Sequence, residues 1–178
     1  MTRALLMTLL LALAGCATQA PAPARLGLRL SPATLGTAIA VEQHLRVERE
    51  GKTDELDAAL EVDAARLQLV GLAFGQRVLT VAYDGKELIS WRHFMLPAQV
   101  RAEDVLEDIQ LTLWPVEAVR AALPAGWTID EQPLRRTVWR DGELVAEIRY
   151  SDSVRWKGIV VLDNRRYRYK LTIETAQQ

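Results

Sequence analysis

The feature that most constrains the fold of this chain is a two-residue alternation of apolar and polar side chains that recurs along most of its length. Such alternation is typical of a β-strand with one face in a core and the other in water. It predicts strands over residues 39–48, 56–63, 67–72, 77–83, 87–94, 134–140, 143–150 and 166–173. We therefore expect a long antiparallel sheet rather than a helical bundle.

Two Asp-Gly pairs, Asp84-Gly85 and Asp141-Gly142, lie between predicted strands and mark hairpin turns. If the second turn has a two-residue loop, the register across it follows directly. The expected cross-strand pairs are Arg136 with Glu147 and Val138 with Val145.

Residues 101–123 break the alternation. Within them Val105, Leu106, Ile109 and Leu113 recur at helical spacing. Pro115 ends or kinks this helix, and residues 116–123 form a second short one. The predicted class is α+β: a strongly curved antiparallel sheet, or incomplete β-barrel, with a short helical insert that covers its concave face.

The first fifteen residues carry one early positive charge and an apolar run that is too short to span a bilayer. They are typical of a signal peptide, and the segment that ends in Cys16 resembles the lipobox of bacterial lipoproteins. This resemblance implies lipidation of Cys16, residues 16–25 as a tether and residues 26–178 as one half-barrel domain. The alternative is an ordinary secretory signal with an incidental cysteine.

The resemblance to lipoproteins also implies a location. Ala17 stands where Asp retains enteric lipoproteins in the inner membrane, which points to the periplasmic face of the outer membrane. Membrane lipid, through Cys16, is then the expected partner. A formal net charge of −1 argues against nucleic acid as a partner, and a single cysteine excludes an intramolecular disulfide.

Residues 71–85 and 105–127 resemble a family of uncharacterised bacterial lipoproteins, a domain of unknown function. That family is distantly similar to the LolA/LolB-like lipoprotein carriers and receptors, whose fold is an incomplete barrel lidded by helices. The similarity implies a cavity for acyl chains or lipidated cargo. The candidate lining residues are Trp91, Leu106, Ile109, Leu113, Trp114 and Trp139. Tryptophans serve equally well in a packed core.

By the same resemblance, a loop between two early strands of the receptor presents an apolar residue to the membrane. Leu72 and Phe74, between Gly71 and Gly75, hold a similar place here and form a candidate membrane or partner loop. The alternative interpretation makes both of them core residues.

The inventory of reactive side chains argues against an enzyme. His44 and His93 are the two histidines, and neither lies in a catalytic or zinc-binding motif. We expect no catalytic residue, no metal site and no cofactor. Four acids, Glu103, Asp104, Glu107 and Asp108, fit a helix N-terminus better than a glycosidase pair or cation site. Four basic residues, Arg165, Arg166, Arg168 and Lys170, form a positive edge that faces either solvent or anionic lipid.

Two functional hypotheses follow. The first is a carrier or receptor that holds acyl chains or lipidated cargo in a half-barrel, for delivery to the outer membrane. The second is a non-catalytic envelope scaffold with a packed core, whose protein partners the sequence does not identify.

Overall fold

The computed structural model of this chain describes residues 25–176. In this range ten strands form one sheet, in the order β5-β4-β3-β2-β1-β10-β9-β8-β7-β6. Its strands are β1 (Ile39–Arg49), β2 (Lys52–Val62), β3 (Leu67–Ala73), β4 (Gln76–Tyr83), β5 (Leu88–Arg92), β6 (Trp127–Gln132), β7 (Arg135–Arg140), β8 (Glu143–Tyr150), β9 (Ile159–Asn164) and β10 (Tyr169–Thr175). All neighbouring strands pair antiparallel.

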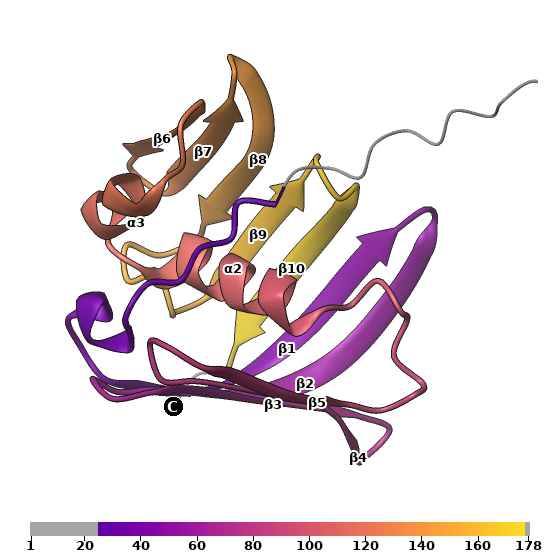
Figure 1. The fold of residues 1–178 in the computed structure, drawn as a ribbon. Coiled ribbons are helices and arrows are strands. Elements are labelled where there is room, and N and C mark those ends of the chain that lie inside the picture. The colour runs from indigo at the N-terminus through magenta and orange to yellow at the C-terminus, as the bar shows by residue number, and fades with distance from the viewer. Residues whose placement is uncertain (1–24, 177–178) are drawn as a thin grey trace, which may run out of the picture.

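The sheet is curved but not closed, because β5 and β6 are free edges. It wraps around helix α2 (Ala102–Leu113), and helix α3 (Val116–Ala122) lies beside β6 and β7 (Figure 1). A single turn of 3-10 helix, η1 (Pro32–Leu35), precedes β1. The predicted α+β class, with its curved antiparallel sheet and helical insert on the concave side, is confirmed.

Helix α2 is enclosed rather than laid over the sheet as a lid. Its residues from Leu106 to Leu113 are all buried, polar ones included. The sheet covers one side of the helix, and residues 25–31 cover the other in an extended conformation (Figure 1). We call residues 25–31 the N-terminal strap.

The strap is held in place by its buried leucines and by hydrogen bonds between its backbone and side chains of α2. Leu26, Leu28 and Leu30 are buried, while the residues between them are exposed. The Gln110 side chain accepts a hydrogen bond from the Leu30 amide at 3.1 Å and donates one to the Leu30 carbonyl at 2.9 Å. This pair reproduces the contacts that a neighbouring strand would supply, so the strap needs no place in the sheet.

The predicted register across Asp141-Gly142 is wrong by one residue. The two turn residues have positive φ, as a two-residue hairpin loop requires, but a β-bulge interrupts β7 and β8 just after the turn. The observed pairs are Arg136 with Ile148 and Val138 with Ala146, in place of Arg136 with Glu147 and Val138 with Val145. Because of the bulge, the side chains of both observed pairs lie on the interior face of the sheet, and all four are buried: Arg136, Val138, Ala146 and Ile148.

Two strands, β6 and β9, were not predicted. The ends of the last predicted strand also differ, because residues 165–168 form the turn before β10, with Arg168 at φ 54°. This turn matters for the site described below, since it directs Arg166 inward.

The predicted signal peptide, Cys16 and most of the tether lie outside the described residues. Within residues 25–176, no helix combines the length and apolar character needed to cross a bilayer.

Candidate functional site

A cavity of about 480 Å³ lies between the concave face of the sheet and the N-terminal half of α2. This volume falls within the range of roughly 300–1,000 Å³ typical of small-molecule sites. Its floor is apolar and comes from β1–β4 and β10: Leu45, Val47, Leu56, Leu69, Leu79, Leu171 and Ile173. Its roof comes from α2 and the preceding loop: Leu96, Val100, Val105 and Ile109.

The floor follows from the alternation in β1 and β10. The inward positions of these two strands pair across the sheet, Leu45 with Ile173 and Val47 with Leu171. Gly71 in β3 keeps the neighbouring floor open, because a Cβ there would lie 3.1 Å from Leu56 Cδ1. The sequence pattern thus produces a continuous apolar surface under α2.

One end of the cavity is polar. There the inward pair of β1 and β10 is Arg49 with Tyr169, and the Arg49 guanidinium lies 5.0 Å from the Tyr169 ring centroid. Arg166 and Tyr167 from the β9–β10 turn and Asp108 from α2 also line this end. The cavity therefore changes from polar to apolar along the strand direction.

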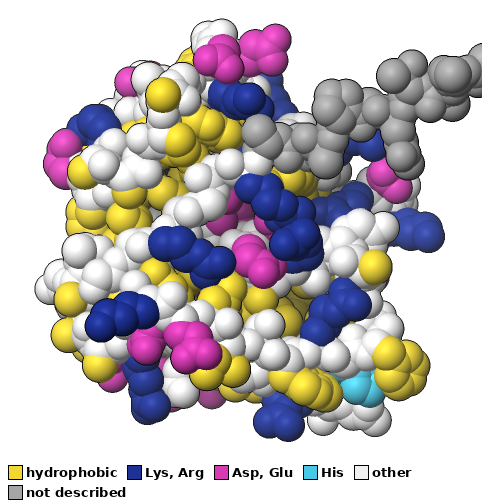
Figure 2. Space-filling model, in the orientation of Figure 1, with side chains coloured by type: hydrophobic (Ala, Val, Ile, Leu, Met, Phe, Trp, Pro, Cys, Tyr) yellow, Lys and Arg dark blue, Asp and Glu magenta, His cyan; other side chains and the backbone are white. Residues whose placement is uncertain are grey.

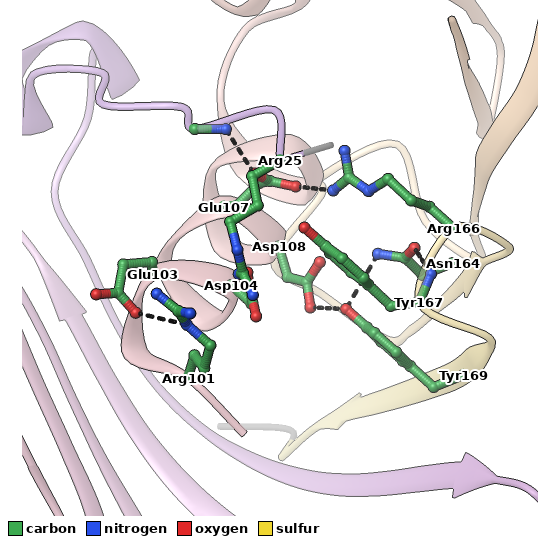
Figure 3. A network of polar contacts seen from close by, with 11 residues as sticks. Arg25, Arg101, Glu103, Asp104, Glu107, Asp108, Asn164, Arg166, Tyr167 and Tyr169 are labelled. Atoms are coloured by element: carbon green, nitrogen blue, oxygen red, sulfur yellow. Dashed lines mark hydrogen bonds and ion pairs between the residues drawn. The ribbon is translucent and has the colours of Figure 1, made fainter. Parts of the chain in front are cut away.

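Buried polar contacts fasten α2 to the β9–β10 turn at this end (Figure 3). The Arg166 guanidinium donates to the Glu107 carboxylate, and the side chains are 7% and 3% exposed. The second Glu107 oxygen accepts a hydrogen bond from the Gly27 amide of the strap at 2.8 Å. Glu107 thus joins helix, turn and strap.

A second set of contacts involves Asp108. The Tyr169 hydroxyl donates to one Asp108 carboxylate oxygen and accepts a hydrogen bond from the Asn164 amide at 3.2 Å (Figure 3). Burial, with smaller contributions from the nearby Glu107 and Asp104, raises the pKa of Asp108 to about 7 against the lowering effect of the Tyr169 hydrogen bond. Burial, together with the Asp108 carboxylate, raises the pKa of Tyr169 well above its ordinary value, so the phenol remains a donor.

Arginine dominates the charged groups around the cavity. Five arginines line it, at positions 25, 49, 101, 166 and 168, against three aspartates at positions 54, 104 and 108. Asp104 is paired with Arg25 of the strap. Figure 2 shows basic and acidic side chains gathered together over α2 and the strap, in the middle of the face that carries them.

Of the six predicted lining residues, the structure places Ile109 at this cavity. Leu106, Leu113 and Trp114 are instead buried in the packed core, because α2 is covered on both sides. Trp114 also donates from its indole to Ser31 and Thr34, which anchors the helix end to η1. Trp91 is 44% exposed on the edge strand β5, and Trp139 is half-buried on β7, so neither lines the cavity.

Two interpretations of charged residues also need correction. Glu107 and Asp108 do more than complement the helix dipole, because both are buried with specific partners. Arg166 was assigned to a positive outer edge, but it lies inside, with Trp127 and Tyr167 rings at 4.9 and 4.3 Å from its guanidinium carbon. The prediction for Arg166 treated residues 166–173 as one strand, whereas residues 165–168 form a turn that directs this side chain toward Glu107.

The predicted apolar loop is exposed. Residues 74 and 75 both have positive φ and form the β3–β4 turn, while Gly71 lies within β3 rather than in the loop. Phe74 is 92% exposed and Leu72 is 39% exposed, so the alternative that makes both core residues does not hold. The loop after β5 adds Phe94, 87% exposed, and Met95, 52% exposed.

The two histidines are placed apart. His44 lies on the outer face of β1 beside Asp57, at 2.9 Å, and His93 packs against Phe94 in the loop after β5. Across residues 25–176, His, Cys, Asp and Glu side chains form no group of three suited to a metal ion.

The comparisons with known proteins add a family but no activity. No curated protein matches the chain. A solved structure of a DUF1329 family protein from Desulfovibrio piger is similar at 13% identity and a TM-score of 0.38, covering 82% of this chain and 87% of that one. Residues 40–177 match the family described as "Protein of unknown function (DUF3261)". The chain therefore belongs to the DUF3261 family.

Proposed function

We propose that this protein binds an acyl chain or another elongated hydrophobic ligand in the cavity under α2. The observation that carries the proposal is the continuous apolar floor of β1–β4 and β10, left unfilled by the helix above it. An apolar cavity of this size costs stability when empty, since its lining residues lose packing contacts. A hydrocarbon ligand would restore those contacts.

The test compares two tryptophan substitutions on opposite faces of the sheet. Leu45→Trp fills the cavity from its floor, whereas Thr172→Trp adds the same side chain to the outer face of β10, across from Arg46. The full chain of each variant is purified from a bacterial host, and the lipids that are not covalently attached are extracted and quantified by mass spectrometry. We expect lipid with the unsubstituted chain and with Thr172→Trp, and several-fold less with Leu45→Trp.

Absence of lipid from all three proteins would favour the second hypothesis, an envelope scaffold. That hypothesis also requires no ligand in the cavity when fatty-acid probes are added to the purified chain. Equal lipid in all three proteins would place the bound lipid elsewhere on the molecule.

We propose that the carrier is a non-catalytic lipoprotein, tethered through a lipidated Cys16 to the periplasmic face of the outer membrane. The lipobox-like sequence and Ala17 support this location. A tether would hold the cavity close to the membrane that supplies or receives its ligand. Buried acyl carbons contribute ~0.8 kcal/mol each, so two or three chains anchor the protein firmly.

We further propose that the exposed end of the β3–β4 hairpin, with Leu72 at the end of β3 and Phe74 in the turn, contacts the membrane. Phe94 and Met95 extend this apolar surface, and the loop that carries them continues into the cavity roof at Leu96. Segments 67–83 and 88–102, which form these strands and loops, contain arginines but no Asp or Glu. This composition suits a surface that approaches anionic lipid.

A further inference from the structure

The polar end of the cavity carries arginine side chains, which the binding of a plain hydrocarbon chain does not require. We propose that its ligand is an aliphatic chain that ends in an anionic group, and that Arg49 and Arg166 receive that group at the polar end. The inference rests on the proposed function, because it specifies the ligand of the same cavity.

The first support is the order of inward residues along β1 and β10. Starting from the polar end, the paired inward positions are Arg49 with Tyr169, Val47 with Leu171, and Leu45 with Ile173. Positive charge is thus confined to one end of the row, the two following pairs are apolar, and the row closes beyond Leu45 with the uncharged pair Gln43 and Thr175. A ligand with one charged end and a hydrocarbon body matches this order.

The second support is a set of buried polar atoms without partners at that end. The donors among them are Arg49 Nε, Arg166 Nε and Nη1 and the Tyr167 hydroxyl, and the remaining atom, Asp108 Oδ1, is an acceptor. All four residues line the cavity. Buried donors without acceptors are costly and uncommon, so a concentration of them in one cavity indicates a missing acceptor.

The geometry of Arg166 favours an acceptor in the plane of its guanidinium group. The rings of Trp127 and Tyr167 lie within 5 Å of the guanidinium carbon, and Glu107 occupies Nη2. Arg166 Nε and Nη1 are left without an acceptor, and because Nη1 lies on the Cδ side of the guanidinium group their N–H bonds point in different directions. Each can donate a separate charge-assisted hydrogen bond to a carboxylate or phosphate oxygen.

An unpaired arginine at the polar end argues against a cationic ligand there. Five arginines line the cavity, and four of them, Arg25, Arg101, Arg166 and Arg168, pair with acidic side chains. Arg49 forms no ion pair with any residue in the described range. A neutral alcohol or hydrocarbon would enter the apolar part but leave the arginine donors unpaired.

The experiment uses the full chain in bacterial membranes and a photoreactive hexadecanoate that carries a diazirine in its chain. Unlabelled hexadecanoate, hexadecyl phosphate and hexadecanol compete with the probe, and cross-linked peptides are identified by mass spectrometry. We expect cross-links on cavity residues, with hexadecanol about tenfold weaker as a competitor than the better of the two anions, because charge-assisted hydrogen bonds are lost. The ranking of the two anions distinguishes a fatty acid from a phosphorylated lipid.

Arg49→Gln tests the assigned residue, and Arg46→Gln is its matched control on the outer face of the same strand, where Arg46 pairs with Glu55. We expect Arg49→Gln to lower cross-linking about tenfold while Arg46→Gln leaves it unchanged, with thermal unfolding of both variants recorded in parallel. If Arg49→Gln does not fold, the competition in the unsubstituted chain still decides the class of head group.

The outcomes separate this inference from the proposed function. Equal competition by hexadecanol and the anions, with cross-links in the cavity, overturns the anionic head group but leaves acyl binding intact. Failure of the probe to label the cavity at all overturns both.

Discussion

The carboxyl group of Asp108 is buried on the cavity side of α2. Its pKa, raised to about 7 by burial, lies above that of the same group in the unfolded chain. Between about pH 4 and the folded-state pKa, the folded protein therefore holds a proton that the unfolded chain releases. Folding stability must then fall as the pH rises through this window and stay low above it.

Replacing Asp108 with Asn should remove this dependence. The amide oxygen still accepts the Tyr169 hydrogen bond but carries no charge at any pH, so we expect the stability of Asp108→Asn relative to the unsubstituted chain to rise between pH 5 and pH 8. Chemical denaturation at both pH values measures the difference.

Asp84→Asn serves as the control. Backbone hydrogen bonds from Glu87 and Lys86 lower the pKa of Asp84, so its contribution is present above the unfolded-state pKa and is lost only as the pH falls through the folded value. It should leave the difference between pH 5 and pH 8 unchanged. A similar change in both variants would contradict the role given to Asp108.

At the scale of elements, the C-terminal part of the strap is held by the Gln110 side chain of α2. Gln110 is fully buried and satisfies both backbone groups of Leu30. Gln110→Ala leaves these groups without partners, and we expect a loss of about 2–4 kcal/mol in the free energy of unfolding. The exposed Gln132→Ala, at the end of β6, should cost much less in the same denaturation experiment.

The β3–β4 turn places a phenylalanine where its backbone is strained. Phe74 has φ 52°, a region in which Asn costs less than an aromatic residue, and Asn-Gly is a preferred pair in such hairpin turns. We expect Phe74→Asn to raise stability by about 1 kcal/mol. The same change should weaken attachment to anionic vesicles of a chain that begins at Ala17 and so lacks the acylated cysteine.

Vesicle flotation and thermal unfolding of that chain measure the two effects. Ile159→Asn is a suitable comparison, because Ile159 is an exposed apolar residue on β9 away from this turn. Unchanged flotation of Phe74→Asn would remove the turn from the membrane contact.

The sequence predicted most elements because alternation and helical spacing report directly on which face is buried. Strand β9 was missed because its apolar residues run consecutively from Ile159 to Leu162, so no alternation marks it. Strand β6 has only a short alternation after Gly126. The bulge at Val145 depends on how β7 and β8 pack against the core, which local pattern does not encode.

The cavity was expected, but five of its six predicted lining residues lie elsewhere: Trp91 and Trp139 are on β5 and β7, and Leu106, Leu113 and Trp114 share another reason. The prediction assumed that α2 presents one apolar face to the hollow, whereas the strap and the sheet cover the helix on both sides. Its cavity face therefore carries Asp104, Asp108 and Ile109 rather than Leu106 and Leu113. Spacing along a helix cannot reveal a second covering layer that comes from a distant segment.

At the scale of the whole molecule, the proposed location predicts a response to single substitutions near the N-terminus. Cys16→Ser should abolish incorporation of an alkyne-labelled fatty acid and release the protein from membranes. Ala17→Asp should move the lipidated protein from the outer to the inner membrane fraction where the enteric sorting rule applies. Retention of the label by Cys16→Ser would overturn the assignment of the acylated residue.

The strap links the N-terminal side of the molecule directly to α2. Arg25 both lines the cavity and pairs with Asp104 of α2, and Gly27 holds Glu107. A pulling force applied to the chain ahead of residue 25 would load these contacts before it reached any strand. Tension along the proposed tether would therefore act first on the contacts of α2 beside the cavity, and would weaken the retention of the proposed ligand.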